Sequence, residues 1–161
     1  MVNYQTLSIV LTGIGLIIAL TYYSLQIRNQ NKTRQAQLFM QIYNRWTDTN
    51  FQENYIEVIN REWEDFVDYN EKYGAIRDVA KRRTIGQYFE GIGVLVYRKF
   101  IDVSLVDDMM SSLLFSFWEK YEPIIKKNRE RLKTPQILEW TEYLYIEVRK
   151  VAERQHPELK T

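Results

Sequence analysis

The pattern of hydrophobic and polar positions divides the chain into an uncharged apolar stretch and a longer amphipathic remainder. Residues 7–27 contain no charged side chain. A helix rises about 1.5 Å per residue, so this stretch would cover about 31 Å, close to the hydrocarbon core of a bilayer at about 30 Å. A signal peptide would have a basic leader, a shorter apolar run and a small-residue cleavage site, and a buried soluble helix would carry charge on one face. The pattern therefore predicts a transmembrane helix over 7–27.

The residues that flank this predicted span indicate its orientation. Arg28, Lys32 and Arg34 follow the span, whereas residues 1–6 contain no Lys or Arg. Basic residues are retained on the cytoplasmic side of a membrane, where they can also contact acidic lipid headgroups. We expect a short extracytoplasmic N-terminus over 1–6 and a cytoplasmic C-terminal domain at the cell membrane. The aromatic residues expected at the two membrane interfaces are Tyr4, Tyr22 and Tyr23.

One face of the predicted span consists of small residues. Ser8, Thr12, Gly15 and Ala19 follow one another in steps of four, three and four residues. Small side chains allow another helix to approach closely within lipid. Chance placement of small residues is the alternative. The partners expected from this part of the sequence are the lipid bilayer and other membrane protein chains, as a homo- or hetero-oligomer.

Beyond the span, apolar residues recur at helical spacing, and the chain contains few turn-forming residues. There are six Gly and three Pro in 161 residues, and none of either between Leu16 and Tyr73. We therefore expect the first helix to continue as a stalk over 28–47 and to enter a cytoplasmic helical domain over 48–154, with a tail over 155–161. The predicted fold is all-α: one N-terminal transmembrane helix continuing into a bundle of about five helices.

Cap-forming residues suggest where the helices of the bundle begin and end. Asn50 and Ser104 each precede an acidic residue by three positions, as in a capping box, and Thr134 stands before a proline. Gly74 is expected to end a helix that starts near Phe51, and Pro123 is expected to kink or restart the helix that follows Ser104. The inward face of that helix is predicted to comprise Leu105, Met109, Leu113, Phe117 and Tyr121.

Three glycines lie inside the helix predicted over 75–99, at Gly86, Gly91 and Gly93. Each costs about 1 kcal/mol relative to Ala in a helix interior, so we expect them to allow close packing against a neighbouring helix. Glu90 lies among them in an otherwise apolar stretch, which makes it a possible buried polar residue. A surface position, or a pairing with an Arg, is the alternative.

Composition excludes most familiar catalytic and metal sites. The chain has no Cys and one His, His156, in the predicted tail, so the usual dimetal ligands and histidine-dependent nucleophile systems are missing. No catalytic residue, metal site or cofactor is predicted. With 22 basic and 21 acidic residues, the charge balance gives no argument for a nucleic-acid partner. The basic clusters at 77–83 and 126–133 are interpreted as solvated faces, or as pairing with the acidic segment 62–71, with anionic headgroups or nucleic acid as the alternative.

Several stretches resemble an uncharacterised prokaryotic family. Residues 88–96 (YFEGIGVLV) resemble its Phe-Glu-x-x-Gly-x-Leu core, and residues 100–102, 105–106 and 117–125 are similar to it as well. The resemblance implies a single-pass, membrane-attached protein with a helical domain of unknown function. It supplies no catalytic residues.

These observations favour a non-enzymatic, membrane-anchored interaction protein, an accessory or scaffold subunit of a larger membrane protein complex. Two alternatives stay open: a regulatory or sensory membrane protein whose helical domain responds to a ligand or a protein, and an enzyme with an unrecognised carboxylate site. A buried polar pocket near Glu90, or two stable conformations of the domain, would favour the regulatory alternative over a passive scaffold.

Overall fold

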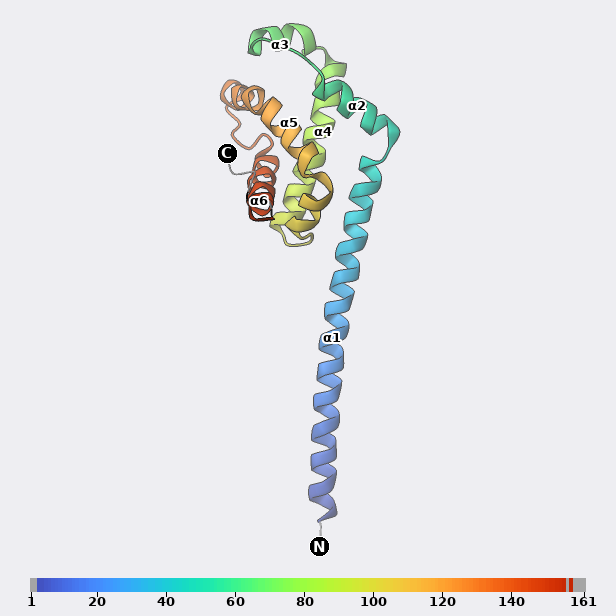
Figure 1. Cartoon of the computed structure of the whole chain (residues 1–161). Coiled ribbons are helices and arrows are strands. Elements are labelled where there is room, and N and C mark those ends of the chain that lie inside the picture. The colour runs from blue at the N-terminus through green and yellow to red at the C-terminus, as the bar shows by residue number, and fades with distance from the viewer. Residues whose placement is uncertain (1–2, 156, 158–161) are drawn as a thin grey trace. The chain divides into compact units, whose positions relative to one another are not determined.

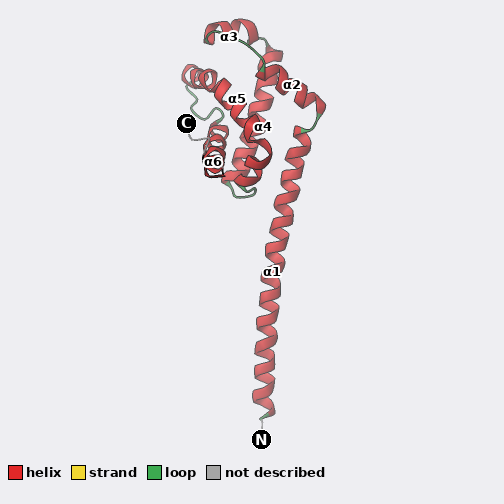
Figure 2. Ribbon diagram, in the orientation of Figure 1, coloured by secondary structure: helices red, strands yellow, loops and turns green. Residues whose placement is uncertain are grey.

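The computed structural model describes residues 3–155 and 157, with the backbone alone for Thr6, and this part of the chain forms six α-helices and no strand (Figures 1 and 2). The predicted all-α fold, a long apolar N-terminal helix followed by about five helices, is confirmed. His156 lies outside the described residues. The helices are α1 (Tyr4–Trp46), α2 (Thr49–Ile59), α3 (Phe66–Tyr73), α4 (Ile76–Tyr97), α5 (Val103–Leu132) and α6 (Glu139–Gln155).

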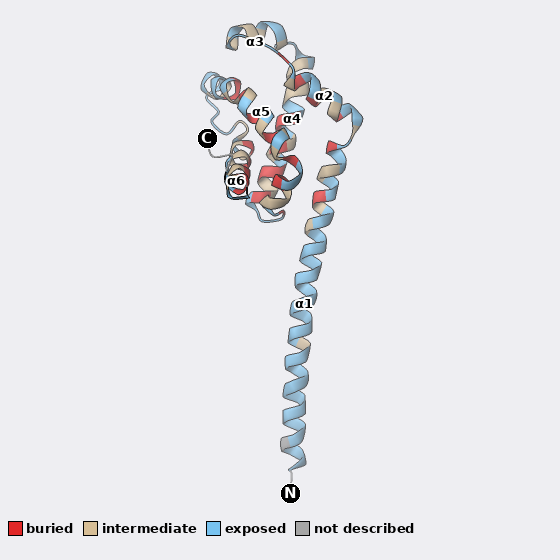
Figure 3. Cartoon of the chain, viewed as in Figure 1, coloured by how far each residue is buried: buried red, intermediate tan, exposed pale blue. Residues whose placement is uncertain are grey.

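The chain divides into two compact units, with the boundary inside α1 between Leu38 and Phe39. In the first unit, the Leu, Ile and Val residues of 7–27 are all exposed, from 46% at Leu7 to 72% at Ile9 (Figure 3). No residue that the structure describes covers these side chains. This unit is a helix with apolar residues around its whole circumference.

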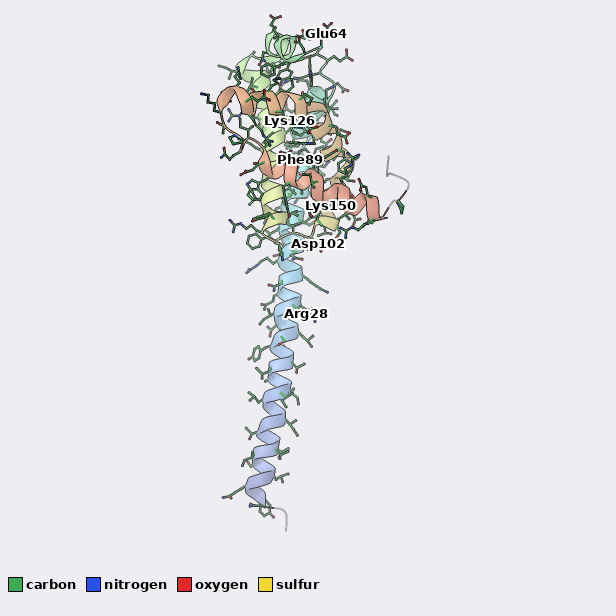
Figure 4. All side chains as sticks on the ribbon, turned by 90° about the vertical axis from the view of Figure 1, so that its left-hand side faces the viewer. Arg28, Glu64, Phe89, Asp102, Lys126 and Lys150 are labelled. Carbon is green, nitrogen blue, oxygen red and sulfur yellow. The ribbon has the colours of Figure 1, made fainter. Side chains whose placement is uncertain are left out.

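The second unit is the helical bundle, which starts with the last turns of α1. In it α4 packs against α2 and α6, and α5 packs against α2, α3 and α6. Phe89 of α4 (labelled in Figure 4) is fully buried, and its ring centre lies 5.7 Å from that of Phe117 of α5. The fully buried apolar residues come from α2, α4, α5 and α6, and they are Val58, Ile85, Phe89, Val106, Leu114, Phe117, Tyr121, Ile125, Leu144 and Val148.

Three tyrosine hydroxyls in the bundle donate hydrogen bonds to backbone carbonyls of another helix. Burial raises the pKa of Tyr55 to about 12, and it also raises the pKa of Tyr88 and of Tyr121. The hydroxyls are therefore neutral donors at physiological pH. These bonds run from Tyr88 to Ile42 (3.1 Å), from Tyr55 to Leu113 (2.9 Å) and from Tyr121 to Val58 (2.7 Å).

Two predicted helix starts are corrected by the structure. Asp48, not Asn50, caps α2 through a 3.0 Å hydrogen bond from the Phe51 amide, and Asp102, not Ser104, caps α5. In both cases an aspartate stands two positions before the residue expected to cap, and its carboxylate accepts from an amide of the first turn.

The buried face of α5 also differs from the prediction. Phe117 and Tyr121 are buried as expected. In the first half of the helix, however, the buried residue is in each case the one that follows the predicted residue in the sequence. The sequence contains adjacent apolar pairs at 105–106, 109–110 and 113–114. Either member of each pair gives the same helical spacing, and only packing against the other helices decides between them. The buried members are Val106, Met110 and Leu114.

Two further predictions concern where helices end and restart. The helix expected to run from Phe51 to Gly74 is two helices, α2 and α3, with α3 capped by Asp65; Gly74 is the C-cap of α3, as expected. Pro123 lies inside α5 and does not restart it.

The glycines of α4 separate into two that approach other residues closely and one that does not. A Cβ atom built on Gly86 would lie 2.8 Å from Leu138 Cδ1, and one built on Gly93 would overlap the Trp140 carbonyl of α6. A Cβ atom on Gly91 would meet open space. The expected close packing is confirmed for Gly86 and Gly93 and is wrong for Gly91.

Gly91 and Gly93 therefore form a matched pair for mutation. Gly91→Ala should raise the free energy of unfolding by about 1 kcal/mol, because only the helix propensity changes. Gly93→Ala should lower it by about 1–3 kcal/mol, because α6 must move to admit the methyl group. Urea unfolding of the full chain in a neutral detergent measures both. The fluorescence signal reports on the bundle, since it contains all four tryptophans, Trp46, Trp63, Trp118 and Trp140. Shifts of the same sign in both variants would contradict this assignment.

Candidate functional site

The first turn of α6 is held by a side chain from α4. Leu138 occupies the position before α6, with a φ of 55°, and its carbonyl accepts from the Glu142 amide at 3.1 Å. A leucine side chain cannot accept a hydrogen bond from the free amides of the helix. Glu90 of α4 takes over this role: its Oε2 atom accepts from the Thr141 amide at 2.8 Å and lies 2.9 Å from the Thr141 hydroxyl.

Glu90 is thus a helix cap supplied by a neighbouring helix. The carboxylate is half-buried, whereas Thr141 is fully buried and its hydroxyl also lies 3.2 Å from the Gly86 carbonyl. A negative charge near a helix N-terminus is favourable because the free amides carry partial positive charge. Glu90 therefore has a structural partner, the α6 terminus.

Sequence reasoning missed Thr141 as the partner of Glu90. It placed a cap at Thr134, but the residues between Thr134 and Glu139 form a turn, and α6 begins after Leu138. The chain at this point contains no residue of the usual N-cap types. The missing N-cap residue is the one signal in the sequence that could have indicated that a side chain from another helix caps α6.

A pocket of about 390 Å³ lies beside Glu90, between α4, the end of α5 and the turn that leads to α6. Its polar lining includes three arginines, Arg82 and Arg83 from α4 and Arg131 from α5, and we call it the arginine pocket. The full set of lining residues is Val79, Arg82, Arg83, Gln87, Glu90, Asn128, Arg131, Leu132, Ile137 and Leu138.

The arginine pocket brings together the two basic clusters that the sequence analysis interpreted as separate solvated faces. Within the described part of the chain, none of its three arginines lies within 4.0 Å of a carboxylate oxygen. Arg131 donates to the Asn128 side chain at 2.9 Å, and the Nε of Arg82 is buried without a hydrogen-bond acceptor. Other cations of the same clusters are paired, as in the 2.6 Å contact between Arg129 and Glu142.

A second charged group, at the junction of α2 and α4, consists of ion pairs. Arg61 is 4% exposed and donates to Glu57 at 3.0 Å and to Asp78 at 2.8 Å, and its guanidinium lies over the Tyr73 ring. Hydrogen bonds from Lys81 and then from Arg61 lower the pKa of Glu57. Because each charge has a partner, this group fastens two helices together and offers no free charge to a ligand.

The residues predicted to contact lipid lie on the exposed surface of α1. Arg28, Lys32 and Arg34 are exposed, and so are the three tyrosines expected at the interfaces (Figure 4). α1 is long and apolar enough to cross a membrane, by length and composition. The interface tyrosines are Tyr4, Tyr22 and Tyr23.

The predicted stripe of small residues in α1 is open. Ser8, Thr12 and Gly15 are exposed and Ala19 is half-exposed, and a Cβ atom built on Gly15 would meet no other atom within 4 Å. The Thr12 hydroxyl donates to the Ser8 carbonyl at 2.9 Å, so it is satisfied within the helix. No group of three or more His, Cys, Asp or Glu side chains that could hold a metal ion occurs among the residues that the structure describes.

Comparison with known proteins gives one match. A family model described as a domain of unknown function (DUF4760) matches residues 9–148. No curated protein and no solved structure matches the chain. The motif on which the sequence resemblance rested has a structural explanation here, because Phe89 fills the core, Glu90 caps α6 and Gly93 allows α6 to approach.

The capping role of Glu90 predicts a stability effect. Glu90→Ala should lower the free energy of unfolding by about 1–2 kcal/mol, because the buried Thr141 amide loses its acceptor. Glu90→Gln keeps one acceptor oxygen and should lose less. Glu53, exposed on α2, is the control: Glu53→Ala should change stability by less than about 0.5 kcal/mol. Urea unfolding followed by tryptophan fluorescence measures all three, and equal effects of the two alanine substitutions would refute the cap.

Proposed function

We propose that this chain, which belongs to the DUF4760 family, is a single-pass membrane protein that holds its helical bundle in the cytoplasm at the cell membrane. The observation that carries the proposal is the first half of α1, whose Leu, Ile and Val side chains are exposed all around the helix. Water is an unfavourable environment for so large an apolar surface. A bilayer of about 30 Å accommodates it over 7–27.

The orientation is proposed from the basic residues alone. Arg28, Lys32 and Arg34 are exposed at the C-terminal end of the apolar segment, where they would meet the acidic headgroups of the cytoplasmic leaflet. The N-terminal residues 1–6 would then lie outside the cell.

For its activity we propose a non-enzymatic role, as an accessory or scaffold subunit of a larger membrane protein complex. Two features support it. The small-residue stripe of α1 is free to contact another transmembrane helix. The bundle also exposes large apolar side chains, including Ile76 at 91% and Phe100 at 53%, which suit contacts with other proteins.

A ligand-responsive regulatory domain is the second candidate, and the arginine pocket favours it. The pocket adjoins Glu90, so an occupant would touch α4, α5 and the turn before α6 at once. Binding there would stabilise the arrangement of these three segments, and a partner protein could recognise that arrangement.

The proposed orientation is testable with a reporter fused to the C-terminus. A reporter active only in the cytoplasm should be active in the wild-type fusion. Replacing Arg28, Lys32 and Arg34 with Gln should give a mixed population, because the orientation signal is lost. The matched control replaces three exposed lysines of the bundle, Lys126, Lys127 and Lys150, with Gln and should leave the orientation unchanged. A wild-type reporter on the outer face of the membrane would overturn the orientation.

The proposed complex is testable by mild detergent extraction from native membranes, followed by native sizing and mass spectrometry. The chain should elute in a particle larger than its detergent-bound monomer, together with other membrane protein chains. Gly15→Leu should shrink this particle by blocking helix contact, whereas Gly13→Leu, which lies off the stripe and equally meets no neighbour, should not. A lone monomer throughout, or equal behaviour of the two variants, would refute the proposal.

A further inference from the structure

We infer that the arginine pocket binds a phosphate monoester that carries an apolar group. The inference concerns the bundle alone and does not depend on how α1 is placed in a membrane. It rests on three features of the pocket: its charge, the lack of ion pairs between its arginines and the described residues, and the apolar side chains in its lining.

The charge of the pocket matches a dianion. Arg82, Arg83 and Arg131 contribute three positive charges and Glu90 contributes one negative charge when ionised, which leaves +2. A phosphate monoester carries about −1.5 to −2 at pH 7, whereas a carboxylate or a phosphodiester carries −1. Guanidinium groups also match the geometry of phosphate oxygens, since each can donate two parallel hydrogen bonds.

The guanidinium groups of these arginines form no ion pair with the described residues. None of them has a carboxylate oxygen of the described residues within 4.0 Å, whereas nearby Lys126 and Arg129 form ion pairs with Glu122 and Glu142. The guanidinium of Arg82 lies over the Tyr69 ring, and that of Arg131 donates to the Asn128 side chain and lies over the Phe66 ring, so neither is bound to an acid. Arg83 forms no hydrogen bond, ion pair or ring contact with the described residues, so its whole guanidinium is available.

Part of the pocket lining is apolar. Leu132, Ile137, Leu138 and Val79 line it together with the arginines, and Leu132 is 56% exposed. The volume of about 390 Å³ lies within the usual range for small-molecule sites, about 300–1,000 Å³. The pocket can therefore hold a phosphate group and a ring or short alkyl chain attached to it. Such a ligand could be a free phosphomonoester or the headgroup of phosphatidic acid with the first part of its acyl chains.

The experiment uses the full chain in micelles of a neutral detergent, with phenyl phosphate as the probe and calorimetric titration as the measurement. We expect saturable binding of one phenyl phosphate per chain. Inorganic phosphate should bind at least threefold more weakly, because it lacks the apolar group, and phenol should show no binding. Absence of saturable phenyl phosphate binding, or equal binding of phenol, overturns the inference.

Substitutions in the arginine pocket test whether phenyl phosphate binds there. The double substitution Arg83→Gln with Arg131→Gln should weaken phenyl phosphate binding at least tenfold. Arg83→Gln alone should weaken it at least threefold, and it keeps the test decisive if the double variant does not fold, because this side chain holds no other residue in place. Arg77→Gln is the matched control: Arg77 is exposed on the same helix outside the pocket, and binding should change less than twofold. Equal weakening by Arg77→Gln and Arg83→Gln would show non-specific attraction and overturn the site.

A final comparison identifies the natural source of the phosphate. Phosphatidic acid added to the micelles should weaken the apparent binding of phenyl phosphate if the lipid headgroup enters the pocket, whereas phosphatidylcholine should not. Unchanged binding in both would assign the pocket to a soluble phosphomonoester. Both results support a phosphomonoester site, provided that Arg83→Gln weakens the binding.

Discussion

The close approach of α4 and the start of α6 is the contact on which the rest of the bundle depends. Gly86, Glu90 and Gly93 follow one another on one face of α4 in steps of four and three residues. The two glycines let the chain around Leu138 and Trp140 come within contact distance, and Glu90 satisfies the Thr141 amide that this approach buries. A methyl group at Gly93 would overlap the Trp140 backbone of α6, one at Gly86 would require the Leu138 side chain to shift, and loss of the carboxylate would leave a buried donor unpaired.

The same contact creates the arginine pocket. Because α6 begins only after the turn at Leu138, the chain between α5 and α6 crosses α4 beside Arg82 and Arg83 and brings Arg131 opposite them. Elsewhere in the bundle, charge is used to fasten helices: Arg61 joins α2 to α4, and Arg129 joins α5 to α6. The three arginines that line this pocket have no ion pair with the described residues, in contrast to Arg61 and Arg129, and this difference is the basis for proposing an anion site there.

The apolar half of α1 poses a different physical problem. A bundle hides its apolar side chains against one another, but the Leu, Ile and Val residues of 7–27 are exposed, and no described residue covers them. The helix continues without a break to Trp46, whose ring packs against Phe51 and Tyr55 in the bundle. One helix thus belongs to both units: its last turns pack in the bundle, and the apolar side chains of its first turns are exposed.

The sequence by itself determined the helical fold, the apolar N-terminal helix and much of the core, because these follow from local periodicity and from a scarcity of turn-forming residues. It also singled out Gly86, Gly93 and Glu90. Only the tertiary structure decided which neighbours these and other residues have. It showed that Gly91 packs against nothing, that Val106 rather than Leu105 is buried, and that two basic clusters about fifty residues apart share a pocket. The reason is physical: spacing along a helix fixes which residues share a face, whereas the neighbour on that face, and the pairing of each charge, depend on contacts between segments distant in sequence.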